Sequence, residues 1–350
     1  MSALPQWATA FDPLGLSAEI RGEPADFQVT ENLSYALDGA GEHEYLWVEK
    51  TGANTSWVAE QLAKFCGIKP RDVGYAGMKD RHAVTRQWFS VCQRNEVHWD
   101  EFVAAGVTIL AHKRHGRKLR RGAHTGNTFR IALRLDDLQS NRTRLDERLA
   151  LISRQGVPNY FGEQRFGRDG GNLALCRSLF AGRRLSHTKQ GIALSAARSL
   201  IFNAILDARV RNGTWNTIVS GELANLDGSG SLFAVDVVSD ELVARCAALD
   251  IHPTGSLWGE GSPRSASQVA ALETAVAAEH ADTAAALVKR RMQAASRALR
   301  LRVSALQWSF AEDVLWLEFE LARGGFATAV LREIVVARMA AANNADYFRA

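Results

Sequence analysis

A single carboxylate in a turn rich in glycine and cations is the feature of this 350-residue chain best suited to chemistry. Asp80 lies between Lys79 and Arg81, after Gly77 and before a strand-like segment at 85–91. Adjacent cations favour the ionised carboxylate that a nucleophile or an electrostatic stabiliser requires. With neither a Ser-His pair nor a second acidic motif beside it, triad hydrolysis and two-carboxylate glycosidase chemistry are disfavoured without being excluded. An ordinary turn aspartate is the alternative interpretation.

A dense basic segment follows at 112–122, with six Lys or Arg residues, two histidines and one apolar side chain, Leu119. The positive side chains in such a run repel one another, and a bound polyanion would offset that repulsion. The run therefore predicts a phosphate-binding surface. A solvated basic loop or hairpin is the alternative. The cations that we expect to contact such a polyanion are Lys79, Arg81, Arg117, Lys118, Arg120 and Arg121.

The composition is that of an ordinary soluble globular protein, with 47% hydrophobic and 23% charged residues. A net charge of +4 permits a nucleic-acid partner only through local clustering of cations. Four cysteines without a Cys-x-x-Cys pair or a histidine at ligand spacing disfavour structural zinc and disulfides, and fit a reducing cytosol. We expect a cytoplasmic protein without metal, leader peptide or membrane span.

The periodicity of the first half predicts a sheet with few helices. A helix is expected over 57–65, with Asn54 and Thr55 at its start. Strand-like patterns lie at 26–31, 44–49, 85–91, 107–110 and 128–135. This mixture predicts an α+β fold on a mixed or antiparallel sheet.

The second half is richer in helical patterns. Helices are predicted over 142–154, 194–212 and 266–300, with polar breaks at 227–231 and 253–263. A strand is expected at 314–321 and a further helix over 327–342. Sheet-like ends around a helix-rich middle suggest a domain inserted into a sheet domain.

Five blocks of sequence, taken in order, resemble the tRNA pseudouridine synthase D (TruD) family along essentially the whole chain. They are residues 23–27, 77–85, 117–129, 157–167 and 325–328. The resemblance implies a pseudouridine synthase catalytic domain of residues 1–152 and 303–350, α+β on a mixed sheet. A helix-rich α+β TRUD insertion domain at 153–302 would interrupt it.

The resemblance also implies an isomerase that converts uridine to pseudouridine at position 13 of tRNA, with Asp80 as the catalytic carboxylate. The family's uridine-contacting positions fall on Phe27, Asn127 and Phe326. Phe129 stands where most other pseudouridine synthases carry a tyrosine beside the base. Arg21 occupies the place of a basic residue that can pair with the catalytic aspartate.

These implied roles are chemically coherent. A uridine must leave its stack to react, and aromatic side chains such as Phe129 and Phe326 can replace about 1 to 3 kcal/mol of lost stacking per base. Asp80 would attack the anomeric carbon or remove a sugar proton, and the base for the C5 proton stays unassigned. The reaction needs no cofactor, and we expect a monomer. The competing hypotheses are a non-catalytic RNA-binding protein and a hydrolase that frees uracil from a nucleoside.

Overall fold

The computed structural model describes residues 5–92 and 97–339 and contains two compact units, each drawn from three stretches of the chain. The sheet unit consists of Gly15–Glu147, Ser304–Gly325 and Val335–Ala350. The helical unit consists of Met1–Leu14, Arg148–Val303 and Phe326–Ile334. The two short stretches of the helical unit, which we expected in the catalytic domain, therefore pack with its long central stretch.

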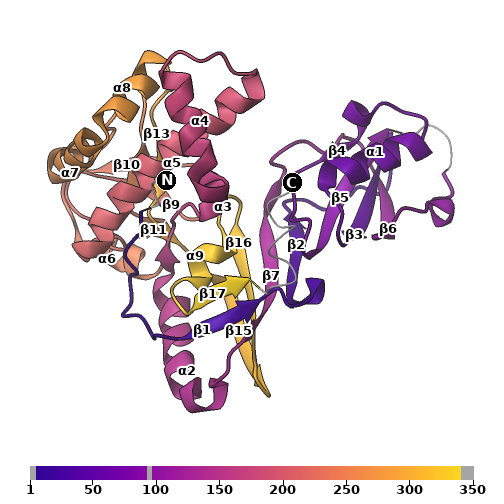
Figure 1. The fold of residues 1–350 in the computed structure, drawn as a ribbon, viewed down its shortest axis with the longest axis horizontal. Helices are drawn as coiled ribbons and strands as arrows, with labels where there is room; N and C mark the ends of the chain where they lie inside the picture. The colour runs from indigo at the N-terminus through magenta and orange to yellow at the C-terminus, as the bar shows by residue number, and fades with distance from the viewer. Residues whose placement is uncertain (1–4, 93–96, 340–350) are drawn as a thin grey trace. The chain divides into compact units, whose positions relative to one another are not determined.

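One large sheet forms the framework of the sheet unit. Its strands are Ser17–Ile20 (β1), Phe27–Leu33 (β2), His43–Lys50 (β3), Gly74–Tyr75 (β4), Val84–Cys92 (β5), Val107–His115 (β6), His124–Arg134 (β7), Ser304–Ala311 (β15), Val314–Ala322 (β16) and Val336–Met339 (β17). Along the sheet they follow the order β15-β16-β7-β2-β5-β3-β6, while β1 pairs with β17 and β7, and β4 with β5 (Figure 1).

The sheet is mixed, as the sequence predicts. β2 runs parallel to β5 and antiparallel to β7, and β1 runs parallel to β17. Side chains along β16 alternate, with Leu315, Leu317 and Phe319 buried and Glu318 and Glu320 exposed. Together with the helices, this sheet confirms the predicted α+β class.

Helix α1 (Thr55–Phe65) packs into a hydrophobic core of the sheet unit. Its buried side chains Val58 and Leu62 pack with Leu46 and Val48 of β3 and with Phe89 of β5. The loop that leads from α1 back to β5 carries Asp80. The core therefore fixes both ends of the segment that we expect to do chemistry.

Helices dominate the helical unit, and small sheets of two or three short strands join them. The helices are α3 (Glu163–Phe166), α4 (Gly171–Phe180), α5 (His187–Arg211), α6 (Asp240–Ala247), α7 (Ser267–Glu279), α8 (Ala281–Lys289) and α9 (Ala327–Leu331). The strands are β8 (Val157–Pro158), β9 (Glu222–Leu226), β10 (Leu232–Val235), β11 (Ile251–His252), β12 (Thr254–Leu257), β13 (Ala295–Ala298) and β14 (Arg300–Leu301). Helix α2 (Leu138–Gln155) crosses from the bounds of one unit into those of the other.

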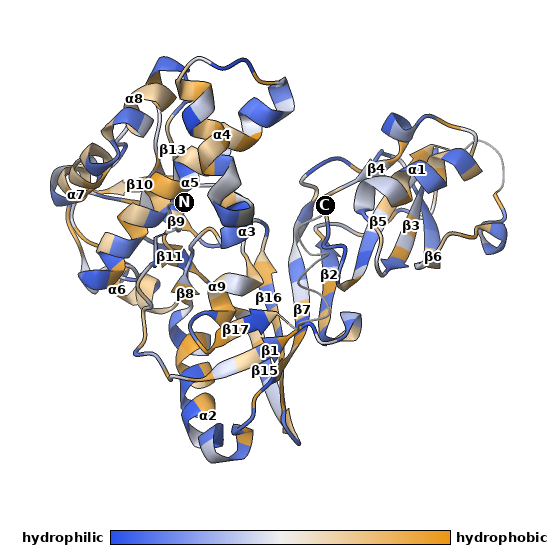
Figure 2. Cartoon of the chain, in the orientation of Figure 1, coloured by the Kyte–Doolittle hydropathy of each residue, from blue (hydrophilic) through white to orange (hydrophobic). Residues whose placement is uncertain are grey.

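Helix α5 is the central helix of this unit. Its buried Ala193, Ala197 and Ile201 pack with residues of α4, α7 and α8, among them Leu179 and Leu287. In the part of the chain that the structure describes, α5 is also the single helix long and apolar enough to cross a membrane, with 50% of its apolar window buried. In Figure 2 the helices of this unit carry both hydrophobic and hydrophilic turns, as is typical of helices with one buried face.

Two predicted helices are wrong at their C-terminal ends. The alanine-rich pattern over 266–300 forms α7 and α8 but then turns at Arg291, whose φ is +56°, into β13 and β14. The helix predicted over 327–342 ends at Leu331, and the chain continues as β17, while residues from 340 lie outside the described range. In both places pairing with a distant strand overrides local helix propensity.

Strands extend into two polar segments. The basic segment at 112–122 begins as the second half of β6, so the strand predicted at 107–110 extends to His115. The polar break at 253–263 contains β12, which pairs with β13. The extension of β6 at 111–115 and the Gly-Ser centre of β12 have low strand propensity, and ladder partners far along the chain stabilise them.

Candidate active site

Residues 77–82 form a loop before β5, and side chains from neighbouring elements hold its first half. Gln87 Nε2 donates to the carbonyl of Gly77 (3.1 Å), and the Lys79 amide donates to Thr55 Oγ1 (3.0 Å). The Thr55 hydroxyl in turn donates to Gln87 Oε1 (2.9 Å), so the predicted helix-capping residue ties α1 to the loop. Gly77 itself is close-packed, since a Cβ there would lie 3.2 Å from the His124 ring.

The second half of the loop is held by β3 and the turn after it. Lys50 Nζ, at the end of β3, donates to the carbonyl of Asp80 (2.8 Å). The Arg81 carbonyl accepts from the Gly52 amide (2.9 Å), and Arg81 Nε donates to the carbonyl of Gly52 (3.0 Å). The backbone on both sides of Asp80 is thus fixed by the protein itself.

The carboxylate of Asp80 is paired with Arg21. Arg21 Nη2 lies 2.7 Å from Asp80 Oδ2, and the His82 amide donates to Asp80 Oδ1 (3.0 Å). The Asp80 side chain is 18% exposed and that of Arg21 is 5% exposed, so the pair lies at the edge of the interior. The guanidinium and the backbone N–H thus hold both oxygens of the carboxylate in place.

A strained turn places Arg21. The residue follows β1 and has a φ of +62°, in the left-handed region that costs about 1 kcal/mol for a residue with a side chain. The next turn, Pro24–Asp26, is closed by the Glu23 amide, which donates to Asp26 Oδ2 (3.0 Å), and by an ion pair of 2.9 Å between Asp26 and Arg134 of β7. Strain of this kind is typical of functional sites.

The cations adjacent to Asp80 in sequence have other partners. Lys79 Nζ pairs with Glu31 Oε2 at 2.6 Å, and these side chains are 5% and 0% exposed. Arg81 is directed to Gly52. The charge that we expected from these neighbours therefore comes from Arg21, and the Lys79 ammonium, predicted to contact RNA, lies inside the unit.

Three of the predicted uridine-contacting residues share one face of the β2–β7 strand pair. In that antiparallel ladder Val29 is opposite Phe129 and Glu31 is opposite Asn127, with Phe27 two residues from Val29. Directly opposed side chains and those two residues apart lie on the same face of a sheet. The Lys79–Glu31 ion pair therefore ties the Asp80 loop to the face that carries Phe27, Asn127 and Phe129.

Aromatic contacts continue from the ion pair into the core. The Arg21 guanidinium lies 4.1 Å from the centre of the Phe27 ring. Phe27 contacts Phe129 edge to face at 6.3 Å, and Phe129 stacks on Phe319 at 5.5 Å. Both Phe27 and Phe129 are buried.

Asn127 presents an acceptor that the protein does not use. Its Oδ1 atom is buried and accepts no hydrogen bond from any residue within 5–92 and 97–339. A buried polar atom without a partner costs about 1 to 3 kcal/mol. A bound group with an N–H donor would remove that cost.

The remaining predicted contacts lie elsewhere. Phe326 belongs to the helical unit, at the start of α9, and its ring lies 6.1 Å from that of Phe161. Arg117 and Arg120 are exposed in the basic segment of the sheet unit. Lys118 Nζ donates to the carbonyl of Arg71 (2.8 Å), and Arg121 lies over the Tyr75 ring at 3.9 Å.

Sequence reasoning missed three polar residues around the loop, Glu31, Lys50 and His124. Burial is the main cause that lowers the pKa of Lys50 to about 8, although the charge of Asp80 opposes this change. Burial and the charges of Lys79 and Arg323 lower the pKa of His124 to about 4, so this imidazole is neutral at pH 7. A polar side chain on the buried face of a strand is the one sequence signal that could have indicated Glu31.

The lowered pKa of Lys50 predicts a pH-dependent stability. Between pH 8 and about 10.5 the folded protein binds fewer protons at Lys50 than the unfolded chain, so the penalty for burying its charge is full below pH 8 and shrinks above it. The stability advantage of Lys50→Met over the wild type should therefore fall by roughly 2 kcal/mol from pH 7.5 to 10. Denaturant unfolding at a series of pH values measures this.

Lys64→Met, on the exposed side of α1, is the matched control and should give a difference that does not vary with pH. A flat profile for Lys50→Met as well would show that Lys50 keeps an ordinary proton affinity in the folded protein.

The described residues contain no group of three or more His, Cys, Asp or Glu side chains that could hold a metal ion. The four cysteines are free thiols, and burial raises the pKa of Cys176 to about 11.

The family model described as tRNA pseudouridine synthase D (TruD) matches residues 8–176 and 178–334. A protein of Methylococcus capsulatus named tRNA pseudouridine synthase D is 44% identical over 321 residues, covering 90% of each chain. One of the same name from Pseudomonas fluorescens is 45% identical over 331 residues, covering 93% of this chain and 92% of its own.

A solved structure, the putative tRNA pseudouridine synthase D of Methanosarcina mazei, shares the fold. Its TM-score is 0.72 at 19% sequence identity, and the match covers 95% of this chain and 96% of that one. The archaeal structure supports the fold alone, whereas the family model and the bacterial relatives extend over nearly all of the sequence. On that evidence, this chain belongs to the tRNA pseudouridine synthase D (TruD) family.

Proposed function

We propose that this protein isomerises uridine to pseudouridine at position 13 of tRNA, with Asp80 as the catalytic carboxylate. The observation that carries the proposal is the 2.7 Å ion pair between Asp80 and Arg21, beside the strand face that bears Phe27, Asn127 and Phe129. An ionised carboxylate on a rigid loop next to an unused acceptor suits a uracil ring, whose N3–H is a donor.

The reaction requires a base that has left the RNA stack. The uracil edge would donate from N3–H to Asn127 Oδ1, while the rings of Phe27 and Phe129 form an apolar wall of the site. Phe326 of the helical unit is proposed as a further aromatic contact to the uridine. Asn127 then discriminates uridine from cytidine, because N3 of cytosine has no proton to donate.

The isomerisation exchanges one bond and one proton. The N1–C1′ bond breaks, the C5–C1′ bond forms, and a proton is lost from C5 and gained at N1. Asp80 starts the first step either by attack at C1′, which forms an ester, or by removal of a sugar proton. Arg21 orients the carboxylate through their 2.7 Å ion pair. Because Phe129 has no hydroxyl, it cannot accept the C5 proton.

Several further properties belong to the same proposal. The predicted catalytic and insertion domains at 1–152 with 303–350 and at 153–302 would act together on one tRNA. Arg81, Arg117, Lys118, Arg120 and Arg121 would bind its phosphates, whereas Lys79 would hold the loop through Glu31. The protein would act in the cytoplasm as a monomer.

Release of tritium tests the reaction directly. A tRNA transcript labelled at C5 of uridine should lose one equivalent of tritium to water for each pseudouridine formed, and carbodiimide labelling with reverse transcription should locate it at position 13. A transcript with cytidine at position 13 is the matched control and should release no tritium.

The competing hypotheses give different products. A non-catalytic RNA-binding protein would bind the transcript and leave every C5 label in place. A hydrolase would free uracil and leave an abasic site that aniline cleaves. Either result would overturn the proposed isomerisation.

A further inference from the structure

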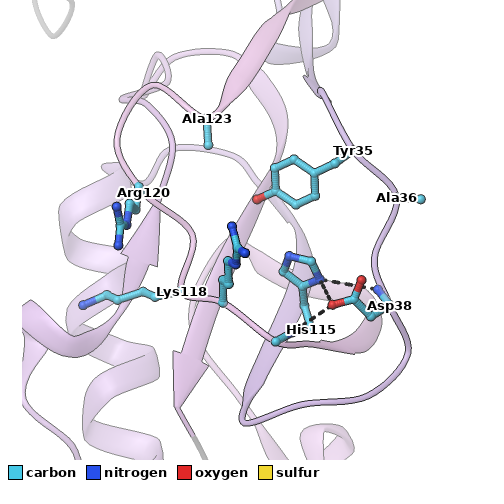
Figure 3. Close-up of a pocket in the computed structure, with 9 residues that line it drawn as sticks. Tyr35, Ala36, Asp38, His115, Lys118, Arg120 and Ala123 are labelled. Carbon is cyan, nitrogen blue, oxygen red and sulfur yellow. Dashed lines mark hydrogen bonds and ion pairs between the residues drawn. The ribbon is translucent and has the colours of Figure 1, made fainter.

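A hollow on the sheet unit lies between the loop at 35–38 and the basic segment at 115–123 (Figure 3). Its volume is about 730 Å³, within the range of roughly 300 to 1,000 Å³ that is usual for ligand pockets. Tyr35, Lys118 and Arg120 surround it, and the His115–Asp38 pair lies on one side (Figure 3). The roles assigned above to the Asp80 loop make no use of this hollow.

The hollow carries positive charge that the protein does not neutralise. Arg117, Lys118 and Arg120 line it, and none of them forms an ion pair within 5–92 and 97–339. The acidic side chain in the lining, Asp38, is already engaged. Its Oδ2 lies 2.7 Å from His115 Nδ1 and accepts from a backbone amide at 3.1 Å. An anionic ligand would supply the missing countercharge.

The backbone that carries these cations is fixed in place. Leu119, the single apolar residue of the basic segment, is buried, and its amide donates to Ser90 Oγ (2.9 Å). The Gly122 amide donates to the carbonyl of Ala76 (2.8 Å), the residue directly before the catalytic loop. A ligand therefore meets cations on an ordered segment, which lowers the entropic cost of binding.

A rigid aromatic ring faces the same space. The Tyr35 ring stacks on His115, with 5.2 Å between ring centres and 19° between planes, and its hydroxyl lies 2.9 Å from that of Tyr45. On the backbone side of His115 the chain packs closely against Gly41, where a Cβ would lie 2.5 Å from the carbonyl of His115. Fixed rings are the usual platforms for unpaired bases.

We propose that this hollow binds a second, unpaired nucleotide of the RNA substrate, separate from the uridine that reacts. Its phosphate would lie against Arg117 and Arg120 and its base against Tyr35. Cations next to a fixed ring suit a phosphate joined to an unstacked base, whereas a duplex keeps its base faces covered. The inference rests on the proposed action on tRNA and adds a place where the enzyme grips the RNA outside the reacting nucleotide.

The two exposed arginines give the first test. Arg117→Ala with Arg120→Ala should weaken binding of a tRNA transcript and lower the slope of log K against log salt by about 1.4, at about 0.7 for each contact to a single strand. Lys64→Ala with Lys69→Ala removes the same charge from exposed positions of the same unit and should leave the slope unchanged. Equal slopes for both double variants would overturn the proposal.

Tyr35 gives the second test. Tyr35→Leu should weaken tRNA binding about 10-fold, the lower part of the range for loss of one base stack, whereas Tyr35→Phe keeps the ring and should bind within about twofold of the wild type. Equal affinity of the wild type and both variants would show that no base stacks on Tyr35 and would overturn the proposal. Should Tyr35→Leu fail to fold, the Phe variant together with the arginine variants still decides, since an unchanged salt slope overturns the proposal by itself.

Competition identifies the ligand chemistry. An unpaired oligoribonucleotide should displace labelled tRNA from the wild type better than a duplex of the same sequence or inorganic phosphate at equal phosphate concentration. It should lose that advantage in Tyr35→Leu. Equal competition by inorganic phosphate would show that the hollow binds anions without recognising a base, and would overturn the proposal. These three experiments measure binding and not turnover. They therefore still test the hollow if the wild-type protein binds tRNA but releases no C5 tritium.

Discussion

Asp80→Asn is expected to lower the rate of pseudouridine formation by about 10⁴-fold or more, the scale of losing an essential nucleophile or base. The amide keeps the shape of the side chain and an oxygen for the His82 amide, but it has no negative charge to start cleavage of the N1–C1′ bond. Single-turnover release of C5 tritium at saturating enzyme measures this step without the contribution of binding.

The matched control is Asp72→Asn, which makes the same change at an exposed carboxylate shortly before the loop. This variant should form pseudouridine at the wild-type rate. Affinity for tRNA should remain within about twofold in both variants, which separates a chemical defect from misfolding caused by loss of the ion pair with Arg21. Tritium release by Asp80→Asn within tenfold of the wild-type rate would exclude Asp80 as the catalyst.

Glu31→Gln is expected to destabilise the sheet unit by about 4 kcal/mol, because it leaves the buried ammonium of Lys79 without a countercharge. Removal of both charges, as Glu31→Leu with Lys79→Met, should recover most of that loss. Hydrogen exchange of the β2 and β5 amides reports the free energy of opening this unit separately from the helical unit.

An exposed pair on the same sheet provides the comparison. Arg86 and Glu49 lie 2.7 Å apart with side chains 38% and 31% exposed, so Glu49→Gln should cost less than about 1 kcal/mol. A cost for Glu31→Gln as small as that for Glu49→Gln would mean that water or another group compensates Lys79.

Amphipathic elements with strong local signals could be predicted from the sequence. The alternation along β16 and the helix at α1 follow directly from which side chains are buried. The loop around Asp80 could be predicted because glycines and charges leave no apolar period there. The ends of helices and strands were harder to predict from the sequence, because β6 continues into the basic segment through pairing with β3.

Contacts between distant segments could not be read from local pattern. Lys50 lies 30 residues from Asp80, and nothing in its own strand distinguishes it from an ordinary surface lysine. The neighbours of Asp80 in sequence were assigned the role of its countercharge, but in the fold Lys79 points to Glu31 and Arg81 to Gly52. Proximity in the sequence therefore suggested the wrong partners for Asp80, whereas the resemblance pointed to Arg21, which the fold places 2.7 Å from the carboxylate.

The pairing of β1 with β17 has a consequence for biosynthesis. Ser17 aligns with Val336 in a parallel ladder, so β1 is synthesised long before the strand that covers this side of it. Until then, the edge of β1 that pairs with β17 is exposed as a free sheet edge, open to pairing with other nascent chains. Translation that stops before Val336 would therefore release a polypeptide with that edge permanently uncovered.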